Sequence, residues 1–430
     1  MKKTTLPYLC VFLICFITFN LWVLSKESLT TALNQPLPLI SQITALLGTV
    51  LLSSTLVLTT RLKFLESVFG GLDRVYLAHR ILGSLAFVYL IIHPFTLAVQ
   101  AFPSTNVSLL YLLPGSDLAY NLGIIGLYLM LISFIFMVFI KLPHHLWKFS
   151  HRALGISFLL GGVHALLIPS DISAFLPLRL WIGTFLTIGL ASLIYTVFFY
   201  KIFGPKYLYR VAKIDRVLDV VNIYLEPSGT KTIHFDPGQF VYVKFRNPQV
   251  GPETHPFSIS SAPQDPFLRL SVKIVGDYTL KIPNLRPGDK AVIFGPHGEF
   301  KATAAPDQNV VWVAGGIGIT PFLSMLRAEA RVKSLNSITF FYCHKEDEGS
   351  VFAEEIKYLR QYIPHLRLVD WCSGEKPRLS AQTISQYAPP PLYRAVFLCG
   401  PPAMMESLVK QFTKLGVTEE NLIFENFSFT

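Results

Sequence analysis

The chain has 430 residues, only 15% of them charged, and its mean hydropathy is +0.46. An ordinary soluble domain carries about 25% charged residues, so this composition excludes a wholly water-soluble protein. Residues 1–200 contain 11 Lys+Arg and 5 Asp+Glu, whereas residues 201–430 contain 26 and 22. The first half is therefore membrane-like, and the second is long enough for two small globular domains.

The net charge and the cysteines exclude further classes. The net charge of +10 divides into +6 and +4 between the halves, so no concentrated basic surface predicts a nucleic-acid partner. The five cysteines form no C-x-x-C pair, which argues against a disulfide framework or a zinc scaffold.

Six apolar stretches are long enough to cross a bilayer, which takes roughly 17–25 residues per helix. They cover residues 7–25, 40–60, 75–100, 118–140, 150–168 and 178–202. With an inner N-terminus, nearly all Lys and Arg of this half lie on the inner side and only Lys26 and Arg179 lie outside. We therefore expect a multi-pass protein in the lipid bilayer of the plasma (inner) membrane, with a cytoplasmic polar half. No small-residue cleavage site follows the first stretch, so we expect it to be retained rather than removed as a signal peptide.

Four histidines interrupt the third and fifth stretches. His79 and His93 are 14 residues apart, which places them nearly on one helix flank at two depths. His151 and His164 are 13 apart, a mismatch in rotation that a helix distortion near Gly161 would repair. Both helices run in the same direction, so the four form two level pairs that suit two bis-histidine haems of b type. The alternative is that they hydrogen-bond across helices as polar contacts.

A short repeat, H-R-x-L-G, occurs at residues 79–83 and 151–155. A glycine four residues after a histidine lies on the same helix face and leaves room for a flat macrocycle. The adjacent Arg80 and Arg152 are predicted to meet haem propionates at the inner surface. His144 and His145 are predicted to lie in a solvated loop.

The polar half begins with short β-like runs over residues 210–221, 239–245 and 268–275, which predict a small antiparallel barrel. Residues 255–261 (HPFSISS), 273–279 (KIVGDYT) and 295–298 (GPHG) gather hydroxyls, amides and a cation around turns. Such groups suit a phosphate-bearing flavin, but they equally suit a strand edge and a turn.

A buried strand pattern at residues 309–314 is followed by a glycine-rich turn, 315–321, and a helix over 322–331. Such a turn lets a helix N-terminus and bare amides approach a pyrophosphate, although the spacing is not G-x-G-x-x-G. Further strands at 338–342 and 395–398, with helices at 352–361 and 403–415, predict an α/β nucleotide fold. Cys399 follows the last strand, where a nicotinamide contact competes with the simpler role of a small buried residue.

Together and in this order, the histidine quartet and the segments 255–261, 275–279, 315–321 and 399–401 resemble the NADPH oxidase and ferric reductase superfamily, in its bacterial NADPH oxidase-like form. The resemblance covers nearly the whole chain from the second apolar stretch onward. It implies a multidomain membrane protein with a six-helix di-haem bundle over residues 1–203, an antiparallel β-barrel FAD domain over 207–304 and an α/β NAD(P)-binding domain over 308–430.

The resemblance also implies roles for individual residues. The haem ligands would be the four membrane histidines. FAD would be bound by His255, Pro256, Phe257, Ser258, Ile259, Ser260, Ser261, Lys273, Val275, Gly276 and Thr279. The nicotinamide nucleotide would be bound by Gly315, Gly316, Gly318, Thr320, Pro321, Gly400 and Pro401, with Cys399 beside the hydride-transfer site. Phe427, for which Phe429 competes, would cover the flavin. The chain departs from the family pattern after the strand at 338–342, where Cys343, His344 and Lys345 replace the serine and arginine often found there. His344 and Lys345 could meet a 2′-phosphate in their place, so we expect NADPH over NADH although acidic residues follow at 346–348.

The function implied is electron transfer from cytoplasmic NADPH, through FAD and two b-type haems, to an acceptor outside. The outer loops, 101–117 and 169–178, are short and nearly uncharged, which favours O2 as the acceptor and superoxide as the product. A ferric-chelate reductase shares every motif. An electron-relay subunit that serves a periplasmic partner also shares them, although the loops indicate no obligatory protein partner.

Overall fold

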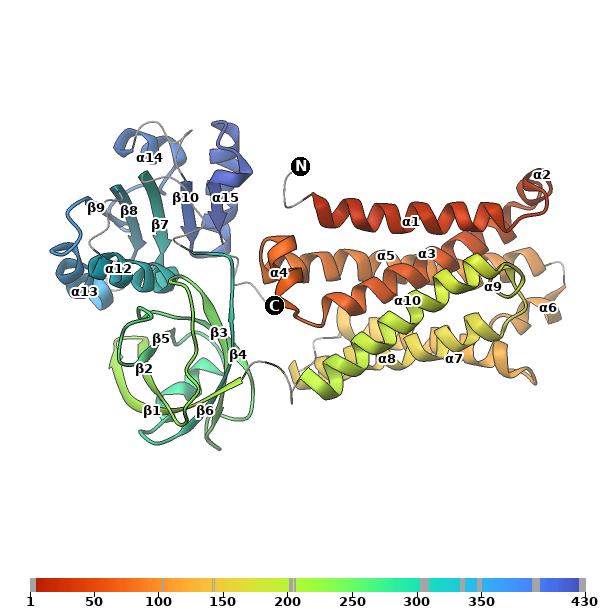
Figure 1. Cartoon of the computed structure of the whole chain (residues 1–430), viewed down its shortest axis with the longest axis horizontal. Coiled ribbons are helices and arrows are strands. Elements are labelled where there is room, and N and C mark those ends of the chain that lie inside the picture. The colour runs from red at the N-terminus through yellow and green to blue at the C-terminus, as the bar shows by residue number, and fades with distance from the viewer. Residues whose placement is uncertain are drawn as a thin grey trace. The chain divides into compact units, whose positions relative to one another are not determined.

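The computed structural model divides into two compact units, Met1–Phe203 and Gly204–Thr430 (Figure 1). The structure describes residues 5–102, 104–140, 142, 144–200, 204, 206–301, 309–332, 337–345, 350–388 and 395–424. Each unit is taken by itself below.

The first unit is helical. Its long helices are α1 (Leu6–Leu24), α3 (Pro36–Leu58), α5 (Leu72–Ala101), α7 (Leu118–Val138), α8 (His144–Leu167) and α10 (Leu176–Ile194), which continues into the π-helical turn η1 (Tyr195–Phe199). Short helices α2 (Leu29–Leu33), α4 (Lys63–Phe69), α6 (Thr105–Leu110) and α9 (Asp171–Ala174) lie between them. Proline in the first turn starts α1, α3 and α10, where a missing N–H costs nothing. Asp117 caps α7 by accepting hydrogen bonds from two backbone amides.

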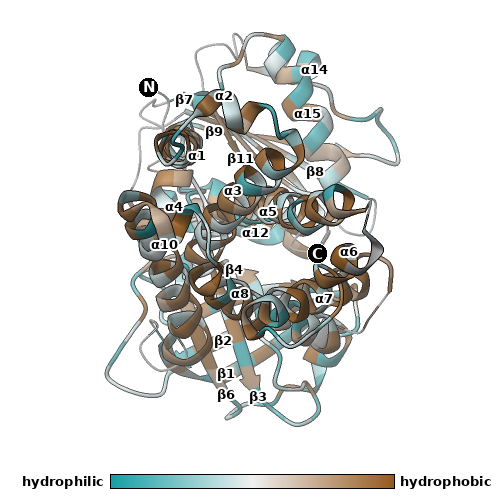
Figure 2. Ribbon diagram, turned by 90° about the vertical axis from the view of Figure 1, so that its right-hand side faces the viewer, coloured by the Kyte–Doolittle hydropathy of each residue, from teal (hydrophilic) through white to brown (hydrophobic). Residues whose placement is uncertain are grey.

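Five of these helices are long and apolar enough to cross a membrane: α1, α3, α5, α7 and α10 with η1. Their outward side chains include many exposed apolar groups, such as Phe12, Phe95 and Phe136, and Figure 2 shows brown along α7 and α10. The first unit is therefore of membrane type. α8 has the length of a span, but its histidines, lysine and arginine lower its hydropathy. His144 begins α8, so the predicted loop at this position is wrong.

Close helix packing accounts for several glycines of the bundle. α5 packs mainly along α3, and α8 mainly along α7. Small residues allow helices in a membrane to approach closely. Gly155 of the H-R-x-L-G repeat lies against the side chain of Leu193 on α10, because a Cβ there would be 2.9 Å from Leu193 Cδ1. The predicted role of Gly155 in leaving room for a macrocycle is therefore wrong, and helix packing explains it instead.

The second unit begins with an antiparallel sheet in the order β4-β3-β6-β1-β2-β5. Its strands are β1 (Lys206–Val217), β2 (Val220–Pro227), β3 (Phe240–Arg246), β4 (His255–Ser258), β5 (Leu268–Lys273) and β6 (Lys290–His297). An isolated bridge pairs Ile259, just after β4, with Leu270 of β5, so the two edges of the sheet meet there. A 3-10 helix, η2 (Thr279–Asn284), follows β5.

We call the antiparallel part of the second unit, residues 206–301, its first lobe, and the part from residue 309 onward its second lobe. One predicted strand of the first lobe is wrong. Residues 210–221 form parts of two strands, because the chain turns at Leu218 and Asp219 between β1 and β2. Leu218 adopts a φ of +54°, which is uncommon for any residue except glycine or asparagine. Since the turn lacks the Asn-Gly or Asp-Gly pair typical of hairpins, the sequence offered only a weak signal for it through Asp219.

The remainder forms a parallel sheet in the order β11-β10-β7-β8-β9. The strands are β7 (Asn309–Gly315), β8 (Ser337–His344), β9 (Leu366–Cys372), β10 (Ala395–Cys399) and β11 (Leu422–Phe424). The helices are η4 (Gly316–Ile319), α12 (Thr320–Val332), α13 (Ser350–Arg360), α14 (Ala381–Tyr387), α15 (Pro402–Lys414) and η6 (Glu419–Asn421). Two separate clusters of apolar side chains cover the two faces of this parallel sheet, as in a doubly wound fold. The strand order reverses between β7 and β10, so a ligand crevice is expected at their carboxyl ends.

Candidate functional site

The four membrane histidines meet in two pairs between α5 and α8. The ring centroids of His79 and His151 lie 5.9 Å apart, and those of His93 and His164 lie 6.4 Å apart. Two metal–imidazole bonds of about 2 Å account for about 4 Å of each separation. The remainder is close to twice the distance from an imidazole nitrogen to its ring centre. Each pair is therefore spaced for two axial ligands on one metal ion, which fits a bis-histidine haem.

Neighbouring helices fix the orientation of these rings. His79 Nδ1 lies 3.1 Å from the carbonyl oxygen of Thr55 on α3, and His164 Nδ1 lies 2.7 Å from that of Ala119 on α7. Because a carbonyl only accepts, Nδ1 must carry the proton and Nε2 keeps its lone pair for a metal. Nε2 has no hydrogen-bond partner among the described residues in either ring. Such second contacts are usual for metal-ligating histidines.

The other two histidines have different partners. His93 Nδ1 lies 2.8 Å from the hydroxyl oxygen and 3.1 Å from the carbonyl oxygen of Ser41 on α3. His151 Nδ1 lies 3.0 Å from the sulfur of Met137 on α7, and the indole of Trp147 stacks on the His151 ring at 5.3 Å and 6°.

The two pairs lie at different ends of the bundle. His79 and His151 are near the beginnings of α5 and α8, at the end where α10 leads to the second unit. At that end the hydroxyls of Thr59 and Thr196 lie 3.1 Å apart and join α3 to η1. The predicted propionate partners, Arg80 and Arg152, are both exposed. α8 is α-helical without interruption over Gly161, so the predicted distortion there is not needed to bring both histidine pairs together.

The predicted flavin segment contains an unusual aromatic contact. The His255 ring stacks on the Tyr278 ring with centroids 3.7 Å apart, and Glu253 Oε2 lies 2.8 Å from His255 Nε2. The Tyr278 hydroxyl is buried and has no hydrogen-bond partner in the described part of the chain. Burial, with a smaller effect of Glu253, raises the pKa of Tyr278, so the hydroxyl remains a donor. A buried donor without a partner beside a stacked ring fits an aromatic, hydrogen-bonding ligand such as a flavin.

The neighbouring residues predicted to bind FAD have varied surroundings. Pro256 and Phe257 pair with Tyr242 and Val241 of β3, and Ser258 pairs with Phe240. Ile259 is buried in the core of the lobe. The hydroxyls of Ser260 and Ser261 are hydrogen-bonded to Arg269, and Ser260 also to Ser271, so they hold the turn rather than point into a crevice.

The loop after β5 is held by one hydroxyl. Thr279 Oγ1 accepts hydrogen bonds of 2.9 Å from the amides of both Val275 and Gly276. The Lys273 ammonium lies 3.4 Å from the Asp219 carboxylate. The structure thus gives Thr279 a role in shaping the loop and places Lys273 at its edge.

Three glycines allow the turns after β7 and β10 to interlock. A Cβ on Gly318 would lie 2.5 Å from the Cys399 carbonyl oxygen. A Cβ on Gly400 would likewise lie 3.0 Å from the Cα of Gly315. Cys399 itself is fully buried. Thr320 and Pro321 begin α12 and are also buried. The predicted nucleotide residues therefore do come together at the strand-order reversal, where Pro401 follows β10.

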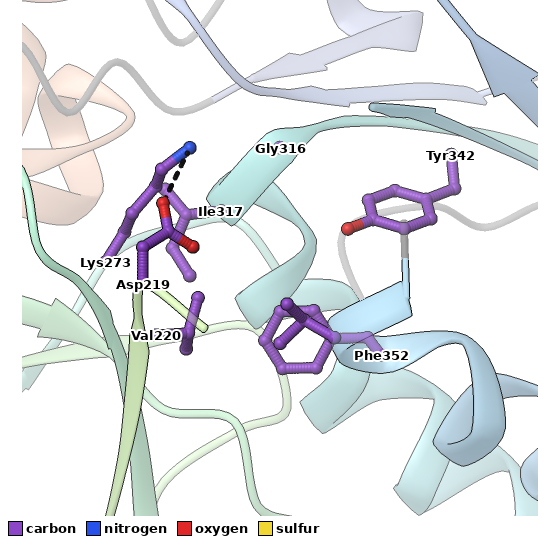
Figure 3. A pocket seen from close by; sticks show the side chains of 8 residues that line it. Asp219, Val220, Lys273, Gly316, Ile317, Tyr342 and Phe352 are labelled. Carbon is purple, nitrogen blue, oxygen red and sulfur yellow. Dashed lines mark ion pairs between the residues drawn. The ribbon is translucent and has the colours of Figure 1, made fainter. Parts of the chain in front are cut away.

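A small pocket joins the two lobes of the second unit beside this turn (Figure 3). Its walls include Lys273 and Asp219 from the first lobe and Gly316 from the second. Tyr342 and Phe352 complete the apolar side. The pocket thus brings together one predicted FAD residue and one predicted nucleotide residue.

Two predicted cofactor contacts are not brought to this pocket. His344 Nε2 lies 2.6 Å from Asp370 Oδ1, and His344 Nδ1 lies 2.7 Å from the Lys345 carbonyl oxygen, so both ring nitrogens are engaged within the chain. Lys345 is exposed. Phe427 and Phe429 lie outside the described residues.

Sequence reasoning missed a buried ion network between the two lobes. Arg269 of β5 makes a bidentate contact with Glu355 of α13, with distances of 2.7 and 2.9 Å. Arg327 of α12 contacts Glu355 at 2.8 Å and Asp265 of the first lobe at 3.2 Å, and Arg331 also contacts Asp265. Burial alone would raise the pKa of Glu355, but Arg269 and Arg327 hold it below its usual value.

Three family models match the chain in the order in which these features occur. They are a ferric reductase like transmembrane component at residues 44–162, an FAD-binding domain at 210–289 and an oxidoreductase NAD-binding domain at 312–410. The chain is thus similar, in this order, to a membrane component and to two nucleotide-cofactor-binding domains of oxidoreductases. Its architecture is that of a ferric reductase-like transmembrane component joined to FAD- and NAD-binding domains.

Two curated relatives match half of the chain or less, and one solved structure matches most of it. Flavohemoprotein A of Dictyostelium discoideum is 25% identical over 50% of this chain and 58% of its own length. One component of the Na(+)-translocating NADH-quinone reductase of Pseudomonas aeruginosa is 31% identical over 34% of this chain and 38% of its own. The chain therefore spans about three fifths or less of the length of these relatives. A flavohemoglobin from Malassezia yamatoensis with bound FAD and heme shares the fold at a TM-score of 0.52 and 16% identity, over 93% of this chain and 98% of that one.

Proposed function

We propose that this protein carries electrons across a membrane from NADPH, through FAD and two b-type haems, to O2, with superoxide as the product. The observation that carries the proposal is the presence of two facing histidine pairs, at 5.9 and 6.4 Å, at opposite ends of α5 and α8. When bound, FAD accepts hydride from the nicotinamide, and the haems pass single electrons.

The bundle residues hold and orient the irons. His79 and His151 would ligate one haem, at the end of the bundle where α10 ends, and His93 and His164 the haem at the other end. The carbonyls and hydroxyl on α3 and α7 keep three of the four rings in the tautomer that ligates through Nε2. α8 then acts as a sixth span, since a helix that supplies two haem ligands must lie beside α5 in the bilayer.

The second unit binds the donor and the flavin. The stacked His255 and Tyr278 rings mark the flavin site, and the interlocked glycine turns after β7 and β10 admit the nucleotide backbone. Lys345 is the exposed cation at the end of β8, and NADPH is the expected donor. The Asp370 carboxylate on His344 supports NADH as the second candidate, since a carboxylate disfavours a 2′-phosphate. Turnover per KM with the two donors, measured side by side, tests this choice.

The sidedness follows the distribution of charge. Lys and Arg are concentrated at the end of the bundle where α10 leads to the second unit. The positive-inside rule then places that end and the second unit in the cytoplasm, at the plasma (inner) membrane.

The far end of the bundle offers little net charge to an acceptor. Lys26 is paired with Asp171 at 2.5 Å, Asp117 caps α7, and Glu27 and Arg179 are exposed and of opposite sign. A small neutral acceptor such as O2 is favoured there. A ferric chelate is the second candidate, because the model that matches residues 44–162 is that of a ferric reductase like component.

The test uses the purified full chain with FAD and NADPH. Cytochrome c reduction that superoxide dismutase abolishes is expected, whereas dismutase-insensitive reduction with rapid reduction of ferric chelates would replace O2 by ferric iron. Haem content by pyridine haemochrome should be two per chain, and one in His93→Leu or in His151→Leu. His234→Gln, on an exposed histidine outside the bundle, should retain both. Two haems per chain in both leucine variants would refute the ligand assignment.

A further inference from the structure

The hydrogen-bond partners of the four histidines are not equivalent. His93 and His164 both direct Nδ1 at oxygen acceptors, at 2.8 and 2.7 Å. Of the other pair, His79 has the Thr55 carbonyl oxygen at 3.1 Å, but His151 has only the Met137 thioether sulfur at 3.0 Å among the described residues. In one pair both rings thus have oxygen acceptors, whereas in the other pair one ring has an oxygen and the other a sulfur.

This difference acts on the metal through the ligand. An acceptor on Nδ1–H makes Nε2 more basic, and a more basic axial ligand stabilises the ferric over the ferrous state. A thioether sulfur is a weak acceptor. The His151 imidazole is therefore the least basic of the four ligands.

We propose that Met137 is a positioning residue that leaves His151 weakly basic, so that the haem of the His79–His151 pair has a higher reduction potential than the haem of the His93–His164 pair. The proposal rests on the haem ligation proposed above. The haem of the His79–His151 pair would then be the readier electron acceptor, and the haem of the His93–His164 pair the stronger reductant toward the external acceptor.

The surroundings of His151 allow this role to be separated from folding. Trp147 stacks on the ring from within α8, so the orientation of the imidazole does not depend on Met137 alone. Met137 lies near the end of α7 and is half-buried, where a side chain of similar length is accommodated.

The test is a redox titration of the full-length holoprotein in lipid nanodiscs, followed by haem absorbance and by EPR of the low-spin ferric signals, with no donor present. Two midpoints are expected. His93→Leu, which retains only the His79–His151 haem, should keep the higher one. Met137→Gln supplies an amide oxygen and should lower that midpoint, with a shift of about threefold to tenfold in the reduction equilibrium, where tenfold is 59 mV. Met137→Leu, which lacks an acceptor, should shift it by less than about twofold.

The outcomes distinguish the inference from the proposed function. Retention of both EPR signals in His151→Leu would mean that the ligand assignment is wrong. With ligation intact, a lower midpoint for the haem that remains in His93→Leu would overturn the inference, and so would an unchanged midpoint in Met137→Gln. The His93→Leu measurement decides the matter even if the glutamine variant fails to bind haem.

Discussion

The buried carboxylate of Glu355 is expected to hold the two lobes of the second unit together, and Glu355→Gln tests this. The Glu355 side chain is 20% exposed, and the Arg269 side chain that it binds is 5% exposed. Glutamine keeps the volume and one acceptor oxygen but removes the charge, and so leaves the guanidinium of Arg269 buried without an anion beside it. The perturbation therefore isolates charge compensation from packing.

The magnitude follows from the burial of the pair. Removing one partner of a buried ion pair costs about 3–5 kcal/mol because the remaining charge is uncompensated. Since glutamine retains one hydrogen bond, we expect a loss of about 3 kcal/mol. For a folding unit of this size about 1 kcal/mol shifts the melting temperature by about 2–4 °C, so the expected decrease is about 6–12 °C.

The assay is thermal unfolding of the full chain, followed by release of flavin fluorescence, with Glu406→Gln as the matched control. Glu406 makes an exposed pair with Lys410, and its loss should leave the melting temperature unchanged. A decrease in Glu355→Gln no larger than in the control would refute the reasoning.

The pH dependence of the stability is a second, independent test of the same ion pair. Because the pKa of Glu355 lies below its ordinary value of 4.5, its contribution is present above pH 4.5 and is lost as the pH falls through the folded-state pKa. The glutamine variant should lack this part of the acid destabilisation.

Two further changes test the nucleotide turn and the helical bundle. Gly318→Ala would place a Cβ 2.5 Å from the backbone of Cys399, and should raise the KM for NADPH at least tenfold with unchanged haem content. Gly229→Ala, with open space around it, is the control, and equal KM values would contradict the close approach. Lys26→Met should leave Asp171 half-buried and unpaired, and should lower the temperature at which haem absorbance is lost. An unchanged temperature would show that the pair does not stabilise the bundle.

The sequence predicted the apolar helices and the parallel sheet well, because long apolar runs and buried strands give strong local signals. Among the features that it missed, two have a clear local reason. β9 carries an arginine and an aspartate within its seven residues, which hides its apolar pattern. The β1–β2 turn is formed by Leu218 and Asp219, and the positive φ falls on the leucine, so the single aspartate gives only a weak turn signal.

The site residues could be predicted where the sequence around them carries a local signal. The histidines stand out because ionisable groups are rare in apolar helices, and the glycine turn stands out because of its composition. Their partners do not, since Thr55 and Met137 are ordinary residues of other helices. Arg269 and Glu355 are 86 positions apart, and the residues around each of them do not predict the contact between the two. Long-range polar contacts of this kind become visible only once the fold brings the elements together.

The same contacts connect assembly of the bundle to electron transfer. α5 and α8 supply the histidines, but α3 and α7 supply the groups that hold Nδ1 of each ring. A change in how α3 packs on α5, or α7 on α8, therefore alters ligand basicity even where the histidines stay in place. Small residues at these helix contacts, such as Gly126 against the backbone of α8, set that packing distance. With haems bound as proposed above, substitutions there should consequently shift the haem potentials before they cause haem loss. A bundle that only encloses its cofactors would instead lose haem without a prior shift in potential.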